Sequence, residues 1–137
     1  MVVLRKSLFL PLHVEQQSSG QCRLYLDLSY LNRFTWKQSV RFEDLRTVFD
    51  LFQSGYFFFT FYRKSGYHHV EMFSDHRQYL GFSWNFGSVV KHFVFTVLPF
   101  GMSLAPYIFS KLVRSLVNYW RGLGRRVVTF SDDGICG

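Results

Sequence analysis

The chain has little cysteine and no long apolar run, and each absence narrows the possible protein classes. Its 137 residues contain two cysteines, Cys22 and Cys136, which form neither a disulfide framework nor the paired spacing of a metal site. A disulfide-stapled module is therefore excluded. No uninterrupted apolar stretch approaches the roughly 18 residues of a membrane span, which argues against a transmembrane helix and a membrane partner.

The sequence also lacks a secretion signal, internal repeats, low-complexity segments and flexible linkers. Its first residues, MVVLRKSLFLPL, are apolar with two cations, but no longer apolar region with a small-residue cleavage site follows them. We therefore expect an intracellular protein of the cytoplasm or the nucleus that is not secreted.

Acidic residues are scarce relative to basic ones. Sixteen Lys and Arg stand against nine Asp and Glu, so the formal net charge is +7. This excess favours a polyanionic partner such as nucleic acid. Because many basic proteins bind no nucleic acid, charge alone leaves the partner open.

Size and residue pattern predict one domain of mixed helices and strands. A folded chain of 16.3 kDa buries roughly two thirds of its unfolded surface, so one core is expected. Apolar residues recur at helical spacing in residues 42–52 and again in residues 108–120, whose whole stripe we expect to be core. Strands are expected at residues 23–28, 56–61, 93–97 and 125–130, the second of them buried. The fold class is therefore α+β.

Two adjacent carboxylates, Asp132 and Asp133, lie in the segment VVTFSDDG at residues 127–134. A β-branched and aromatic run meets a turn-forming Asp-Gly pair here, which predicts a hairpin tip whose returning strand is barely present. Enzymes that use two divalent cations hold them about 3.5 to 4 Å apart with crowded carboxylates, so the pair points to nucleotidyl transfer. The alternative is that Asp-Asp-Gly serves only as turn chemistry.

Four segments in this order and spacing resemble the reverse transcriptases of retroelements. They are RLYLDLSYLN (23–32), FFFTFYRKSGYHHVEM (57–72), FVFTVLPFGMSLAPYIFSKL (93–112) and VVTFSDDG (127–134). The detail of KSGYHHVEM and FTVLPFGMSLAPYIF is most similar to retrotransposons of the DIRS type.

The resemblance implies a right-hand polymerase with an antiparallel palm sheet flanked by helices. The chain would form a single incomplete domain, with residues of about 1–36 and 70–104 fingers-like and those of about 37–69 and 105–137 palm-like. The implied activity is RNA-directed DNA polymerase. The implied partners are an RNA or DNA template with its primer, deoxynucleoside triphosphates and the missing remainder of the polyprotein.

The resemblance also implies a nucleotide-binding set. Arg23 would contact the triphosphate, Tyr67 would pack under the sugar, and Phe100 with Gly101 would lie near the nucleotide and template. The alternatives are a solvated arginine, core packing of the tyrosine and an ordinary loop anchored by an aromatic ring. Lys64 and Lys91 are more readily explained as solvated surface.

Four histidines, at positions 68, 69, 76 and 92, could suggest a transition-metal site. No pair of them repeats the i, i+4 arrangement of a zinc helix, so zinc binding is not expected.

Tyr62 is the departure that bears on activity. In the family, magnesium would be held by Asp132 and Asp133 together with an aspartate five residues before Tyr67, and that position is Tyr62 here. A phenol has a reference pKa near 10 and is a poor substitute for a carboxylate ligand. Glu71 and Asp75 lie too far downstream to replace it.

We therefore expect a catalytically defective copy of a reverse transcriptase domain. Two further hypotheses stay open: a non-catalytic nucleic-acid-binding remnant, and a degraded reading frame without a selected function. Arg63, which replaces an apolar residue beside Tyr62, points the same way as Tyr62, and scattered sequence drift is the simplest account of both.

Overall fold

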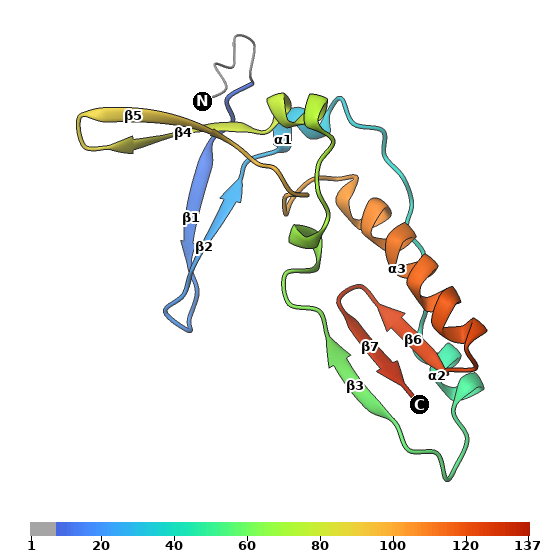
Figure 1. Cartoon of the computed structure of the whole chain (residues 1–137). Helices are drawn as coiled ribbons and strands as arrows, with labels where there is room; N and C mark the ends of the chain where they lie inside the picture. Colours follow the sequence, from blue (N-terminus) through green and yellow to red (C-terminus); the bar gives the residue numbers. More distant parts are fainter. Residues whose placement is uncertain (1–7) are drawn as a thin grey trace. The chain divides into compact units, whose positions relative to one another are not determined.

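The computed structural model describes residues 8–137 (Figure 1). The stretch on which the absence of a secretion signal was judged lies largely in residues 1–7, outside the described residues. The described chain falls into two compact units. Unit 1 consists of the residues up to Trp36 together with Tyr67–Ala105, and unit 2 consists of Lys37–Gly66 together with Pro106–Gly137.

Unit 1 is built from two antiparallel hairpins and short helical turns. The hairpins pair β1 (Leu12–Gln16) with β2 (Cys22–Leu26), and β4 (Gly81–Phe86) with β5 (Val89–Val94). The helical segments are α1 (Ser29–Asn32) and the 3-10 turns Gly66–His69 and Ser74–Tyr79. The strand expected at 93–97 is wrong in its bounds, because the chain leaves the ladder after Val94.

The core of unit 1 is a cluster of four buried leucines at positions 10, 26, 28 and 80. Met72, Phe82, Phe95 and Met102 pack against it. Strand β1, with the sequence LHVEQ, was not predicted from the sequence. Its alternation of Leu12 and Val14 with polar residues is short, and four of its five residues are exposed.

Unit 2 packs helices against one antiparallel sheet. Its helices are α2 (Leu45–Leu51) and α3 (Ala105–Gly122), and its strands β3 (Phe59–Tyr62), β6 (Val127–Phe130) and β7 (Asp133–Cys136) lie in the order β3-β7-β6. Helix α2 begins later than expected because Asp44 caps it. The Asp44 carboxylate accepts hydrogen bonds from the backbone N–H groups of Arg46 (3.0 Å) and Thr47 (3.3 Å).

The returning strand after the acidic turn is fully formed, so the prediction that it is barely present was wrong. Although β7 has four residues, it is the central strand and pairs with both β3 and β6. The expectation of a buried strand at 56–61 was also wrong. β3 begins at Phe59 and lies at the sheet edge, and the Phe59 and Tyr62 side chains are 61% and 66% exposed.

The apolar stripe of α3 divides between two faces. Phe109, Val113 and Val117, spaced four residues apart, are buried. Leu112 and Leu116 are 52% and 40% exposed, so the expectation that the whole stripe is core was wrong. A stripe this wide covers more of the helix circumference than one sheet face can contact. Together with Val127 and Val128 of β6, the buried residues give unit 2 its own apolar interior, where a single core was expected.

Within residues 8–137, no helix is both long enough and apolar enough to span a membrane.

Gly134 of β7 allows the Phe61 ring to lie across the sheet. A Cβ at Gly134 would overlap that ring, with two further ring carbons 2.6 and 2.7 Å away. We expect Gly134→Ala to lower the free energy of unfolding by about 1 to 3 kcal/mol through overpacking. Urea unfolding of both proteins measures this change in the free energy of unfolding. The matched control is Gly122→Ala, where no described atom lies within 4 Å and stability should stay equal or rise slightly. Equal effects of both variants would contradict the packing account.

Candidate functional site

One end of the sheet in unit 2 brings Tyr62 beside Asp133. Tyr62 is the last residue of β3 and pairs with Asp133, the first residue of β7, which in turn pairs with Phe130 of β6. Side chains directly opposite on neighbouring strands project from the same face of a sheet. The second acid of the hairpin and the tyrosine at the expected acid position therefore share one face.

This face borders a hollow of about 950 Å³. The strands contribute Thr60, Tyr62, Phe130, Asp133 and Ile135, and the segment that leads into α2 contributes Glu43, Asp44, Arg46 and Val48. A hollow of this size is within the range of small-molecule sites. Its lining combines apolar side chains with Tyr62 and the charged residues Glu43, Asp44, Arg46 and Asp133.

Asp132, the first acid of the hairpin, is turned elsewhere. Its Oδ1 atom is buried and has no hydrogen-bond partner among the described residues. A Cβ on Gly66 would overlap this oxygen and would lie 2.6 Å from Cζ of Phe109, so the carboxyl sits against these two residues. Burial raises the pKa of Asp132; Arg63 lowers it, and the negative charge of Asp133 raises it further.

Arg63 supplies a positive charge at this hairpin. Its backbone N–H donates to the Asp132 carbonyl oxygen (2.8 Å), and its guanidinium Nη2 donates to the Ser131 carbonyl oxygen. The guanidinium lies over the rings of Phe61 and Phe109, at 5.7 and 5.5 Å. Burial lowers the pKa of Arg63 and the two acids raise it, yet an arginine stays protonated in proteins.

The donor set at the hairpin does not fit a pair of magnesium ions. Magnesium prefers oxygen ligands in a near-octahedral arrangement, and a two-ion site needs carboxylates that converge. Here Asp132 is directed at Gly66 and Phe109, and Asp133 adjoins the phenol of Tyr62. Arg63 adds a positive charge at the place where the cations would bind. Across residues 8–137, no group of three or more His, Cys, Asp or Glu side chains could hold a metal ion.

A second set of expected residues gathers around Phe100 in unit 1. The Arg23 guanidinium carbon lies 5.9 Å from the Phe100 ring centroid, and the Tyr67 ring lies at 5.3 Å. The His68 ring meets Phe100 edge-on at 4.7 Å. The structure thus brings Arg23, Tyr67 and Phe100 together, and it adds His68, which the sequence analysis had considered only as a zinc ligand.

Asn32 holds the loop that carries Phe100 and Gly101. Its amide Nδ2 donates to the Gly101 carbonyl oxygen (2.9 Å), and its Oδ1 accepts from the Ser103 backbone N–H (2.8 Å). Gly101 has a φ of +87°, in the left-handed region that glycine adopts without strain. Asn32 was not predicted from the sequence. A polar amide that ends the segment RLYLDLSYLN was the available signal, because such side chains often bond to backbone.

This second set combines a cation with flat aromatic rings. A guanidinium presents donors that match phosphate oxygens, and the adjacent rings offer flat apolar surface for a sugar or base. Arg23, Tyr67, Phe100 and Gly101 belong to unit 1, whereas Tyr62, Asp132 and Asp133 belong to unit 2.

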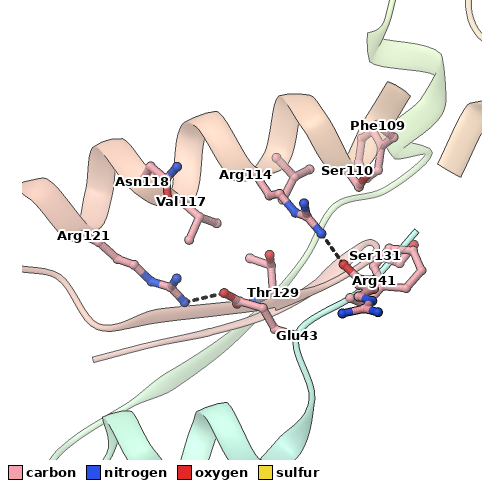
Figure 2. Close-up of a pocket in the computed structure, with 12 residues that line it drawn as sticks. Arg41, Glu43, Phe109, Ser110, Arg114, Val117, Asn118, Arg121, Thr129 and Ser131 are labelled. Carbon is pink, nitrogen blue, oxygen red and sulfur yellow. Dashed lines mark hydrogen bonds and ion pairs between the residues drawn. The ribbon is translucent and has the colours of Figure 1, made fainter. Parts of the chain in front are cut away.

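A small hollow beneath α3 is lined by side chains that hold the helix and the sheet of unit 2 together (Figure 2). Its volume of about 40 Å³ has room for a few water molecules only. The Glu43 carboxylate there pairs with Arg121 (2.7 Å) and accepts the Thr129 backbone N–H (3.1 Å). Arg121 also donates to the Val127 carbonyl oxygen. Side chains thereby satisfy the free edge of β6, which protects it from pairing with another strand.

Comparison with known proteins gives one family. The family model described as reverse transcriptase (RNA-dependent DNA polymerase) matches residues 16–137, which include all seven expected site residues. No curated protein matches the chain.

We expect His68 to make stability depend on pH. Partial burial, followed by the charge of His69, lowers the pKa of His68, so the unfolded chain takes up the proton first as pH falls. Stability should therefore be lost as pH falls below about 6.5, and His68→Gln should remove that loss. Thermal unfolding of both proteins between about pH 8 and pH 5 measures this pH dependence of stability. Parallel pH profiles for the two proteins would contradict this assignment.

Proposed function

Because the chain belongs to the reverse transcriptase family, we propose that it binds a nucleotide and a template as this family does, without performing nucleotidyl transfer. The observation that carries the proposal is the register of β3 against β7, which puts Tyr62 directly opposite Asp133. At this place the resemblance calls for an aspartate. A phenol is neutral at pH 7, so the sheet end lacks one of the charges that the reaction needs.

Arg63 reinforces the defect. In an active enzyme the hairpin acids would be free to take divalent cations, whereas here they face a guanidinium bonded to the hairpin backbone. The two substitutions, Tyr62 and Arg63, are adjacent in sequence and act on the same two carboxylates. We therefore expect no metal-dependent step at this hairpin.

The nucleotide-binding part of the proposal rests on unit 1. Arg23 would donate to triphosphate oxygens, and the rings of Tyr67 and Phe100 would contact the sugar and base. Asn32 would keep the loop in the conformation that lets the Gly101 backbone approach the nucleotide. The contacts among these residues are already made without ligand, so little ordering is needed on binding.

Several finer assignments belong to the same proposal. Unit 1 would be fingers-like and unit 2 palm-like, and the division after residues 36, 66 and 105 supports this assignment. The parent element would be a DIRS-type retrotransposon whose polyprotein supplies the remaining parts. The protein would act in the cytoplasm or nucleus on an RNA or DNA template with its primer.

The distribution of charge favours retained nucleic-acid binding over a degraded reading frame. Unit 2 contains ten Lys and Arg against five Asp and Glu. A surplus concentrated in one unit can neutralise backbone phosphates, and such binding weakens steeply as salt rises.

Primer extension tests the catalytic defect. We expect the purified chain to extend no primer on RNA or DNA template with magnesium or manganese. Tyr62→Asp alone should gain little affinity for manganese, because Arg63 remains at the hairpin. The double variant Tyr62→Asp, Arg63→Leu should bind manganese at least about tenfold more tightly, as titration by electron paramagnetic resonance measures.

The matched control is Tyr119→Asp with Arg63→Leu, since Tyr119 on α3 is 64% exposed, close to the 66% of Tyr62. It adds the same charge elsewhere and should leave manganese affinity low. Magnesium-dependent extension by the unmodified chain would refute the proposed defect.

Arg23→Ala tests nucleotide binding. Loss of charge-assisted hydrogen bonds to phosphate should weaken the binding of a fluorescent deoxynucleoside triphosphate by about tenfold or more. Arg33→Ala, which removes an arginine from the same unit, is the control and should bind normally. If both variants bind equally well, Arg23 does not contact the triphosphate.

A further inference from the structure

One face of the β4–β5 hairpin is rich in aromatic residues, which make up four of its six side chains. The register pairs Phe82 with Phe93, Trp84 with Lys91 and Phe86 with Val89. Because successive side chains of a strand alternate between faces, these six residues share one face. We refer to them as the aromatic face. The opposite face carries mostly small or polar residues, namely Gly81, Ser83, Asn85, Val90, His92 and Val94.

The aromatic face is anchored at one end and exposed toward the other. Phe82 packs on the leucine core of unit 1 and stacks on Phe93, with centroids 5.4 Å apart. Farther along the hairpin, Trp84 is 39% exposed and Phe86 54% exposed. In Figure 1 the hairpin extends outward from the rest of unit 1. Contiguous exposed apolar surface of this kind marks an interaction site in soluble proteins.

The charge of the hairpin indicates what the partner carries. Residues 81–94 include Lys91 and His92 and contain no Asp or Glu. The Lys91 ammonium lies 5.4 Å from the Phe86 ring centroid, and Lys91 is the direct cross-strand partner of Trp84. A cation is thus held among exposed rings. The face complements a ligand with flat apolar surfaces linked by negative charges.

We propose that the aromatic face binds single-stranded nucleic acid. Trp84, Phe86 and Phe93 would stack with unpaired bases, and Lys91 would contact a backbone phosphate. A duplex would bind less well, because its bases present their edges rather than their faces. The inference rests on the proposed function for the class of partner, but it needs neither catalysis nor the residues around Phe100.

Binding of a labelled oligonucleotide of about ten nucleotides to the full chain tests the proposal, with fluorescence anisotropy as the measurement. We expect oligo-deoxythymidine and oligo-uridine to bind more tightly than a duplex hairpin. Trp84→Ala and Phe86→Ala should each weaken single-strand binding by about tenfold. Trp84→Phe keeps a ring and should retain most of the affinity, which separates stacking from misfolding.

Controls lie in the same unit. Trp36→Ala removes an 81% exposed indole outside the hairpin and should leave affinity unchanged. Asn85→Ala changes the opposite face and should also have no effect. Lys91→Ala should lower the slope of log affinity against log salt by about one, as expected for one lost phosphate contact.

The outcomes separate this inference from the proposed function. If the unmodified chain binds single strands and the Trp84 and Phe86 variants bind equally well, the aromatic face is not the site, while nucleic-acid binding stands. If the unmodified chain binds no oligonucleotide even at low salt, both proposals fail. If the variants change the sedimentation of the protein but not its affinity for single strands, the face is a protein interface and the inference is overturned.

Discussion

The backbone ladder that β7 makes with both of its neighbours is the constraint on which unit 2 depends. Four residues, Asp133 to Cys136, pair with β3 on one side and β6 on the other. This pairing sets the register, and a shift of one residue would move Tyr62 to the other face of the sheet. Gly134 permits the register, because the Phe61 ring occupies the space that a side chain there would need.

Once the register is set, the charges at the sheet end follow from local geometry. Asp132 lies in the turn and is directed toward Gly66 and Phe109, while Asp133 lies on the strand beside Tyr62. Arg63 comes directly after β3 and so lies next to both acids. Burial acts on Asp132 and Arg63 in opposite senses, raising the pKa of the acid and lowering that of the base. The attraction between the two charges offsets part of the effect of burial on each pKa.

Unit 1 uses aromatic rings in two different ways. Around Phe100 the rings are held together by a loop that Asn32 clamps, which gives a compact set suited to one small ligand. On the β4–β5 hairpin the rings form a row along a ribbon, which suits an extended ligand. In both places a single cation, Arg23 or Lys91, lies against a ring. On the proposals made for both places, ring and cation together would bind ligands that combine bases with phosphates.

The sequence by itself determined the family and most of the candidate residues. The acidic pair follows from its own segment, whereas Arg23, Tyr67, Phe100 and the acid position at Tyr62 follow from the resemblance to the family's ordered motifs. Periodicity also located both helices of unit 2, and the mixed α+β class followed from the alternation of helical and strand patterns. These features are local, so a single sequence can display them.

Only the tertiary structure decided which of these residues meet, and how. The opposite directions of Asp132 and Asp133, the approach of Arg63 and the split of the α3 stripe all depend on strand register and on which helix face the sheet covers. Asn32 acts on a loop 69 residues away, a long-range contact that no local pattern encodes. Strands β1 and β4 escaped prediction because their alternation of apolar and polar residues spans only five or six positions and is largely exposed.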